Sequence, residues 1–371
     1  MKKNERFGLM PAVMIQILSV GLVNHVLIVP LLLHVAKRDS WMCPVIALAF
    51  GILWVSFPIL GTIKRLNEPL MSMLERTIGK AGAWIFKVPL CLVLFCVALN
   101  TLIDTTSWSK TTYLPETPTL VITSFTALIV LFAAASGLRT IAYASAVLLP
   151  FVVILGDFVL TANLPHKEYV YLKPFLEHGW APVWQGSLLS ACVLTEMYGL
   201  VLYQHYLKRK FKWIHLAILV VILSLLTIGP LTGAITQFGP DEAERMRYPA
   251  FSQWRLVQVG KYIEHLDFFA IYQWISGSMI RMALGVFLIT DILSLRTGWR
   301  KKGAFAVQML LIVSLAEIAC NHMVQYRKLL NYFFPLTGAI VVTIGVVVWL
   351  IAMVGSRTQG RRAVAEGGDA G

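Results

Sequence analysis

The sequence predicts an all-α polytopic membrane protein with ten transmembrane helices. Of its 371 residues, 57% are hydrophobic and only 14% are charged, whereas soluble proteins carry about 25% charged residues. The apolar residues form long segments of about 20 residues, the length at which a helix crosses the hydrocarbon core of a bilayer. These segments cover residues 8–35, 43–63, 83–107, 118–137, 140–163, 184–204, 213–238, 266–294, 303–321 and 334–354. They predict a single membrane domain over residues 1–355.

The basic side chains predict that both termini are cytoplasmic. The net charge is +13, and Lys and Arg concentrate in the cytoplasmic loops of membrane proteins. If the N-terminus is cytoplasmic, 20 of the 32 Lys and Arg lie on the cytoplasmic side and 11 on the other, with Arg281 inside a segment. Membrane orientation therefore accounts for the charge, and we expect the lipid bilayer as a partner but no nucleic acid.

Two long, partly amphipathic connections indicate an internal repeat. Residues 67–82 follow the second apolar segment, and residues 240–265 follow the seventh. The first would be cytoplasmic and the second external, which are equivalent places if two five-helix halves have opposite orientations. In transporters with such inverted 5+5 repeats, the binding site lies at the midplane, where the first helix of each half is interrupted.

Both of these first helices contain candidate interruptions. The stretch LSVGLVNHVLIVP includes Gly21, Asn24 and Pro30, and the stretch GSLLSACVLTEMYG includes Thr195 and Glu196. Glycine tolerates unwinding, and polar side chains satisfy backbone groups that leave the helix. Small and polar residues also occur at ordinary helix–helix contacts in membranes, so both interpretations stay open at this point.

Arg281 is the most unusual residue, because it lies near the middle of the apolar stretch FFAIYQWISGSMIRMALGVFLITDIL. A charge at the bilayer centre costs about 2.5–3.5 kcal/mol on insertion scales, so such a side chain is expected to face the bundle and to have a partner. Arg281 either binds the carboxylate of a ligand or pairs with Glu196, and that pair is either static or rearranged by ligand. Asp104 is a second candidate, in a polar path or as a partly solvated end residue.

The sequence contains no motif that predicts catalysis. It has no HExxH, no GxSxG and no Gly-rich phosphate loop. The five cysteines show no CxxC or Cys/His spacing that would predict zinc. We therefore expect no enzyme activity, no metal and no cofactor. Residues 356–371 are Gly-rich and charged, and their composition predicts a disordered cytoplasmic tail.

The stretch GPLTGAITQFGPDEAERMRYPAFSQWRLVQVGKYIEHLDFFAIYQWISGSMIR resembles the same region of spore-germination permeases, the B subunits of endospore germinant receptors. These proteins belong to the amino acid–polyamine–organocation superfamily. The resemblance covers roughly residues 5–355 and implies a fold of the leucine-transporter type in the inner membrane of the endospore. It also implies an A-type membrane subunit and a C-type lipoprotein as partners. The implied ligand is a small germinant such as an amino acid, which the chain senses.

The resemblance further implies a pocket on helices 1, 3, 6 and 8. With the candidates above, the expected ligand residues are Gly21, Asn24, Asn100, Asp104, Glu196, Met197, Ser276, Ser278 and Arg281. Many members of the family lack an arginine at the position of Arg281, so the resemblance implies a role for this residue in a subgroup only. The alternative function is a secondary amino acid transporter driven by H⁺ or Na⁺. For that function, oxygen atoms of Ser19, Asn24 and Ser278 are candidate ligands of the coupling ion.

Overall fold

The computed structural model describes residues 6–258, 260, 264–295 and 298–368. Within these residues the chain is helical apart from its connections, and one isolated β-bridge joins Phe7 to Leu207. The α-helices are α1 (Leu9–Leu22), α2 (Val29–Ala36), α3 (Met42–Trp54), α4 (Leu60–Arg65), α5 (Leu70–Thr112), α6 (Thr119–Ala135), α7 (Leu138–Ala162), α8 (Trp180–Leu194), α9 (Gly199–Tyr203), α10 (Trp213–Phe238), α11 (Pro240–Arg245), α12 (Pro249–Arg255), α13 (Phe269–Ile292), α14 (Gly298–Asn321) and α15 (Met323–Gly368).

Eight segments of the described chain are long and apolar enough to cross a membrane. They are Leu9–Arg65, Leu70–Thr112, Leu138–Ala162, Trp180–Tyr206, Trp213–Phe238, Leu266–Ile292, Gly298–Asn321 and Met323–Val354. This confirms the predicted all-helical, multi-pass architecture. The first of these segments contains two of the predicted apolar segments, separated by the 3-10 turn Lys37–Trp41. A further predicted segment corresponds to the shorter apolar helix α6.

The first apolar helix departs from α geometry in its middle. The residues Val23–Leu27 form a π-helical turn between α1 and α2, closed by a bond from the Ile28 amide to the Val23 carbonyl at 3.0 Å. Pro30 has no amide hydrogen, so it cannot continue the α-helical hydrogen bonds through this region. The departure begins after Gly21, which remains α-helical. The departure therefore lies within the predicted stretch and begins two residues after Gly21.

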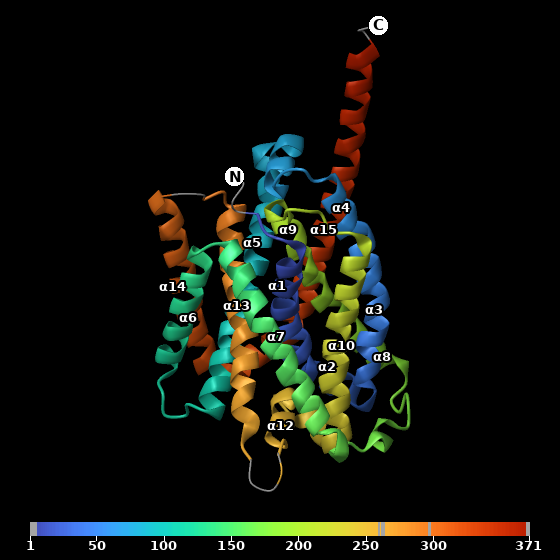
Figure 1. Ribbon diagram of the computed structural model, residues 1–371, viewed down its shortest axis with the longest axis vertical. Helices are drawn as coiled ribbons and strands as arrows, with labels where there is room; N and C mark the ends of the chain where they lie inside the picture. The colour runs from blue at the N-terminus through green and yellow to red at the C-terminus, as the bar shows by residue number, and fades with distance from the viewer. Residues whose placement is uncertain (1–5, 259, 261–263, 296–297, 369–371) are drawn as a thin grey trace.

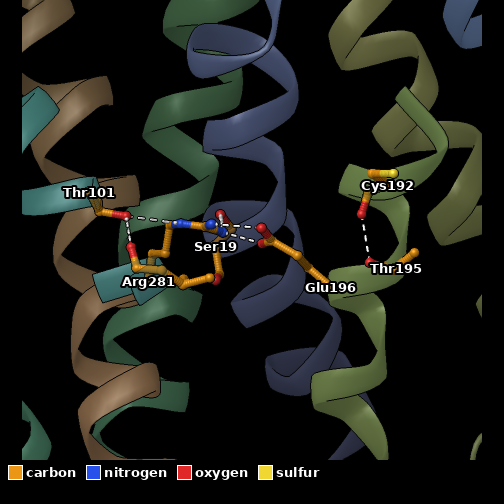
Figure 2. Close-up of polar contacts among 7 residues, drawn as sticks. Ser19, Thr101, Cys192, Thr195, Glu196 and Arg281 are labelled. Carbon is orange, nitrogen blue, oxygen red and sulfur yellow. Dashed lines mark hydrogen bonds and ion pairs between the residues drawn. The ribbon is translucent and has the colours of Figure 1, made fainter. Parts of the chain in front are cut away.

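The helix that contains Glu196 shows a comparable change. The residues Thr195–Tyr198 form a 3-10 turn between α8 and α9. Thr195 Oγ1 donates a hydrogen bond to the Cys192 carbonyl at 2.6 Å (Figure 2). The tighter winding of a 3-10 turn alters the direction in which successive side chains point. This turn places Glu196 at the junction of two short helices.

Both long connections contain helical structure. The segment after the second apolar helix forms the start of α5 and bends at Gly79, whose φ of 79° suits a residue without a side chain. The other connection forms α11 and α12. Part of the predicted external connection, residues 259 and 261–263, lies outside the described residues.

The helices run side by side along the long axis of the molecule (Figure 1). Helix α13 lies within the bundle and packs against α1, α5, α6 and α7. We call the end where α1 begins the terminal end, and the end that carries α12 the distal end. Helix α15 ends beyond the bundle on the side of the terminal end (Figure 1). It continues to Gly368, whereas the composition predicts an irregular tail over residues 356–371, of which 369–371 lie outside the described residues.

Candidate functional site

Arg281 and Glu196 form an ion pair in the interior of the bundle (Figure 2). Arg281 Nη2 donates to Glu196 Oε1 at 2.8 Å, and Nη1 donates to the other carboxylate oxygen. The Arg281 side chain is 1% exposed and that of Glu196 is 14% exposed. The guanidinium therefore contacts both oxygens of one carboxylate, the geometry that makes arginine–carboxylate pairs strong.

Two further contacts hold the guanidinium in place. Arg281 Nε donates to the Thr101 hydroxyl of α5 at 3.0 Å, and Nη1 donates to the Ser19 carbonyl of α1 at 3.1 Å. Four segments of the chain thus meet at one side chain: α1, α5, α13 and the 3-10 turn that carries Glu196. A buried charge is tolerated when it is both paired and hydrogen-bonded, and Arg281 meets both conditions.

Two glycines on α13 allow this convergence. Gly277 and Gly285 lie four residues before and four residues after Arg281, so all three share one face of the helix. A Cβ atom at Gly277 would lie 3.2 Å from the Leu18 carbonyl oxygen of α1, and one at Gly285 would lie 3.2 Å from the Leu94 carbonyl oxygen of α5. These glycines were not among the residues predicted from the sequence, although their spacing about Arg281 was a usable signal.

A cavity of about 60 Å³ adjoins the ion pair. It extends to the terminal side of the pair, because Gln16 precedes Ser19 on α1, and Leu284 and Leu288 follow Arg281 on α13. Polar groups at the cavity come from Gln16, Ser19, Tyr198 and the pair itself, and most of the wall is aliphatic. The aliphatic wall consists of Val20, Leu90, Val93, Leu94, Val97, Leu202, Leu284, Leu288 and Val341. Such a space suits a small molecule with a polar head and a short apolar part.

A wider cleft of about 910 Å³ opens at the terminal end of the bundle. It and the cavity are both lined by Leu202. Asp291 lies on the cleft wall, where it accepts a hydrogen bond from the Tyr206 hydroxyl at 2.7 Å and lies 3.6 Å from His205 Nε2. The cleft therefore approaches the ion pair from the terminal end.

A layer of aromatic side chains lies on the distal side of the ion pair. Trp108 of α5 and Trp274 of α13 stack with ring centroids 4.3 Å apart and planes 3° apart. Phe251 of α12 and Tyr113 pack edge-on against Trp108. Trp108, Trp274 and Phe251 are all buried. We refer to Trp108, Tyr113, Tyr248, Phe251 and Trp274 as the aromatic layer.

A second ion pair borders the aromatic layer. Arg247, from the connection between α11 and α12, places Nη2 3.1 Å from Asp104 Oδ1 of α5. Its Nε donates to the Tyr248 hydroxyl at 2.8 Å. Burial, reinforced by the negative charge of Asp104, raises the pKa of Tyr248 above its ordinary value, so that hydroxyl stays protonated at neutral pH. The pair ties α12 to α5.

The structure distributes the predicted ligand residues over several places. Glu196 and Arg281 line the cavity, whereas Asp104 belongs to the distal pair and Asn100 accepts a hydrogen bond from the Tyr326 hydroxyl. A Cβ atom at Gly21 would lie 3.0 Å from Leu226 Cδ1, so this glycine faces α10.

The other predicted residues are buried and lie outside the cavity lining. Ser278 donates to the Ile275 carbonyl of its own helix at 3.1 Å. Asn24 is 2% exposed, and its side-chain nitrogen donates to no group that the structure describes. Met197 and Ser276 are buried as well. Within the described ranges, no three His, Cys, Asp or Glu side chains are grouped closely enough to hold a metal ion.

Comparisons with known proteins identify the family of the chain. The family model described as "Spore germination protein" matches residues 9–325. The chain is 36% identical to "Spore germination protein XB" of Bacillus anthracis over 321 residues, which cover 86% of this chain and 90% of that protein. It is 22% identical to "Spore germination protein KB" of Bacillus subtilis (strain 168) over 315 residues, which cover 80% and 81% of the two chains.

Proposed function

Because the chain belongs to the spore germination protein family, we propose that it is a nutrient-sensing, permease-like subunit of a spore germinant receptor. In this role it binds a small germinant such as an amino acid next to Arg281 and Glu196 and signals to partner subunits. The observation that carries the proposal is the ion pair at a helix interruption, adjoining a cavity. A ligand carboxylate can replace Glu196 at the guanidinium with the same two-point geometry.

We also propose that the bundle has ten crossings arranged as two inverted five-helix halves of the leucine-transporter type. The turn Lys37–Trp41 divides the first apolar span, and α6 supplies a further short helix, which supports ten crossings. The π turn Val23–Leu27 and the 3-10 turn Thr195–Tyr198 interrupt the first helix of each half. Equivalent interruptions are expected where such halves meet.

The proposed location is the inner membrane of the endospore, with both termini cytoplasmic. The excess of Lys and Arg on the terminal side supports this orientation. The terminal cleft would then open to the spore interior, and α12 would lie on the outer side. The proposed partners are an A-type membrane subunit and a C-type lipoprotein.

Secondary transport driven by H⁺ or Na⁺ is the second candidate. It is favoured by the asymmetry of the paths to the ion pair, since a cleft approaches from the terminal end while the aromatic layer lies on the distal side. Uptake of radiolabelled amino acids into vesicles that contain the full chain separates the two functions. A sensor gives binding without accumulation, whereas a transporter accumulates substrate in response to an ion gradient.

The exchange Arg281→Lys tests the proposed binding role. Lysine keeps the charge but cannot make two parallel hydrogen bonds to one carboxylate. We expect the nutrient concentration for half-maximal germination to rise about ten-fold or more, equivalent to about 1.4 kcal/mol of binding. Arg255→Lys on α12 is the matched control, because Arg255 is exposed. Unchanged nutrient sensitivity in Arg281→Lys, at normal protein abundance, would remove Arg281 from the ligand site.

A further inference from the structure

Gln16 of α1 is a buried amide whose orientation is fixed by its neighbours. Its side chain lies on the terminal side of Ser19, and the residue is 1% exposed. Gln16 Nε2 donates to the Tyr203 hydroxyl at 2.9 Å, and that hydroxyl lies 3.4 Å from the Ala12 carbonyl oxygen. The single hydroxyl proton points to the carbonyl, so the hydroxyl oxygen must accept from Gln16. The amide nitrogen of Gln16 therefore faces Tyr203.

This orientation leaves the amide oxygen of Gln16 without a donor. Gln16 Oε1 is buried and accepts no hydrogen bond from any residue that the structure describes. A buried acceptor without a partner costs about 1–3 kcal/mol. Gln16 lines the same cavity as Glu196, and so does Tyr198, whose buried hydroxyl likewise bonds to no described group. The cavity thus combines a carboxylate with polar atoms that lack partners.

The size of the cavity limits which groups can donate a hydrogen bond to Gln16 Oε1. On the same scale, a group the size of a water molecule occupies about 10–15 Å³. The cavity of about 60 Å³ therefore has room for roughly four to six such groups. Outside its carboxylate, alanine has three non-hydrogen atoms, one of which is the amine nitrogen. The apolar wall suits its methyl group, while Gln16 requires a donor, as Glu196 does once a ligand carboxylate replaces it at Arg281.

We propose that Gln16 Oε1, together with the Glu196 carboxylate, binds the primary ammonium group of a short amino acid whose carboxylate binds Arg281. This assignment rests on the proposed function, because it divides the ion pair between the two ends of one ligand. A zwitterion has no net charge, so it can replace the contacts within the pair without adding charge to the membrane interior. The ammonium has three donors, which match the available oxygen acceptors. Gln16 is thus the residue that selects amines.

The test compares three ligands that differ at one position. Alanine, lactate and propionate share a carboxylate on a two-carbon tail, and carry an amine, a hydroxyl or neither group beside the carboxylate. Their binding is measured by calorimetry on the purified full chain in lipid nanodiscs. Hydrogen bonds to charged groups contribute enough to change affinity by about 10-fold to 100-fold. We expect alanine to bind that much more tightly than propionate, with lactate between them.

Two variants test whether Gln16 causes the preference for alanine over propionate. Gln16→Leu has a similar volume but no acceptor, so we expect the affinity for alanine to fall at least about ten-fold while that for propionate stays unchanged. Tyr203→Phe is the matched control: it removes the other partner of Gln16 but keeps the free acceptor, so the preference for alanine should persist. The reason is that the Tyr203 hydroxyl contacts the nitrogen side of the amide.

Other binding results would contradict either the amine site or the proposed function. Equal affinity of the wild type for alanine and propionate, or an unchanged preference in Gln16→Leu, overturns the amine site. If Gln16→Leu weakens all three ligands equally, the donor to Gln16 is a retained water, which also overturns the assignment. If none of the three binds the wild type, or if Arg281→Lys leaves every affinity intact, the proposed function itself fails.

Discussion

Two arginines in this molecule pair with a carboxylate, and their surroundings differ sharply. Arg281 is 1% exposed, lies within α13 and contacts both oxygens of Glu196. Arg247 is 25% exposed, lies in the connection before α12 and contacts one oxygen of Asp104. The second oxygen, Asp104 Oδ2, has no partner among the described residues. Both carboxylates are largely buried, so the two pairs differ in the exposure of the arginine and in the number of oxygens that it contacts.

The difference shows how burial determines the geometry that an ion pair needs. Deep in the bundle, desolvation is costly, and only a pair with good geometry and further hydrogen bonds offsets it. Thr101 and the Ser19 carbonyl supply those extra bonds to Arg281. At the distal pair, Arg247 is partly exposed, so solvent can supply the remaining contacts of its guanidinium, whereas the unpaired oxygen of Asp104 is buried. We therefore expect the two pairs to respond very differently to mutation.

The largest expected effect comes from breaking the deep pair. Arg281→Met leaves Glu196 as an uncompensated charge, so we expect the free energy of unfolding to fall by about 3–5 kcal/mol. The double variant Arg281→Met with Glu196→Gln removes both charges and should recover much of this loss. Chemical denaturation of the purified full chain in detergent measures each value. A double variant no more stable than Arg281→Met would show that the two side chains are not energetically coupled.

A smaller effect is expected from the helix contact that supports the deep pair. In Gly277→Ala, the new methyl group would lie 3.1 Å from Leu22 Cβ and 3.2 Å from the Leu18 carbonyl oxygen, which forces α1 and α13 apart. Overpacking of this kind costs about 1–3 kcal/mol. Gly229→Ala on α10 is the control, because a Cβ there meets nothing within 4 Å. Equal melting temperatures of the two variants would contradict the close approach at Gly277.

The smallest effect is expected from the distal pair. Arg247→Gln removes the charge beside the buried Asp104 carboxylate, but glutamine can still donate a hydrogen bond to it, so we expect a loss of stability of about 1 kcal/mol. The loss should shrink as salt is added, because solvent-exposed charges are screened. Thermal unfolding of the full chain at low and high salt measures both features. A loss as large as that of Arg281→Met would mean that Asp104 depends on the charge of Arg247 as strongly as Glu196 depends on that of Arg281.

Much of the architecture was predictable because it depends on local composition. Each long apolar segment must form its backbone hydrogen bonds internally when it lies in a bilayer, and a helix achieves this. The predicted apolar segments accordingly lie within helices, and the helix interruptions lie close to Pro30 and Glu196. The cost of a buried charge also identified Arg281 and required a partner for it.

Other features could not be derived from the sequence, because they depend on which faces of distant helices meet. Gly21 and Asn24 have the composition of a binding segment, yet Gly21 packs against α10 and Asn24 lies outside the cavity lining. Asp104 pairs with Arg247, which is 143 residues away in the chain. Gln16 was not selected, because a single glutamine in an apolar helix gives no signal until its neighbours are known.

The sequence by itself determined a multi-pass helical membrane protein, its family and the arginine that must be compensated within the bundle. Hydrophobic length, the distribution of charge and one long motif are properties of the linear chain, so they can be read without coordinates. Only the tertiary structure decided that Glu196 is the partner of Arg281, and that Gln16, Tyr198 and aliphatic side chains surround the adjoining cavity. These assignments depend on the rotation and crossing of packed helices, which arise from contacts over the whole bundle rather than from any local pattern.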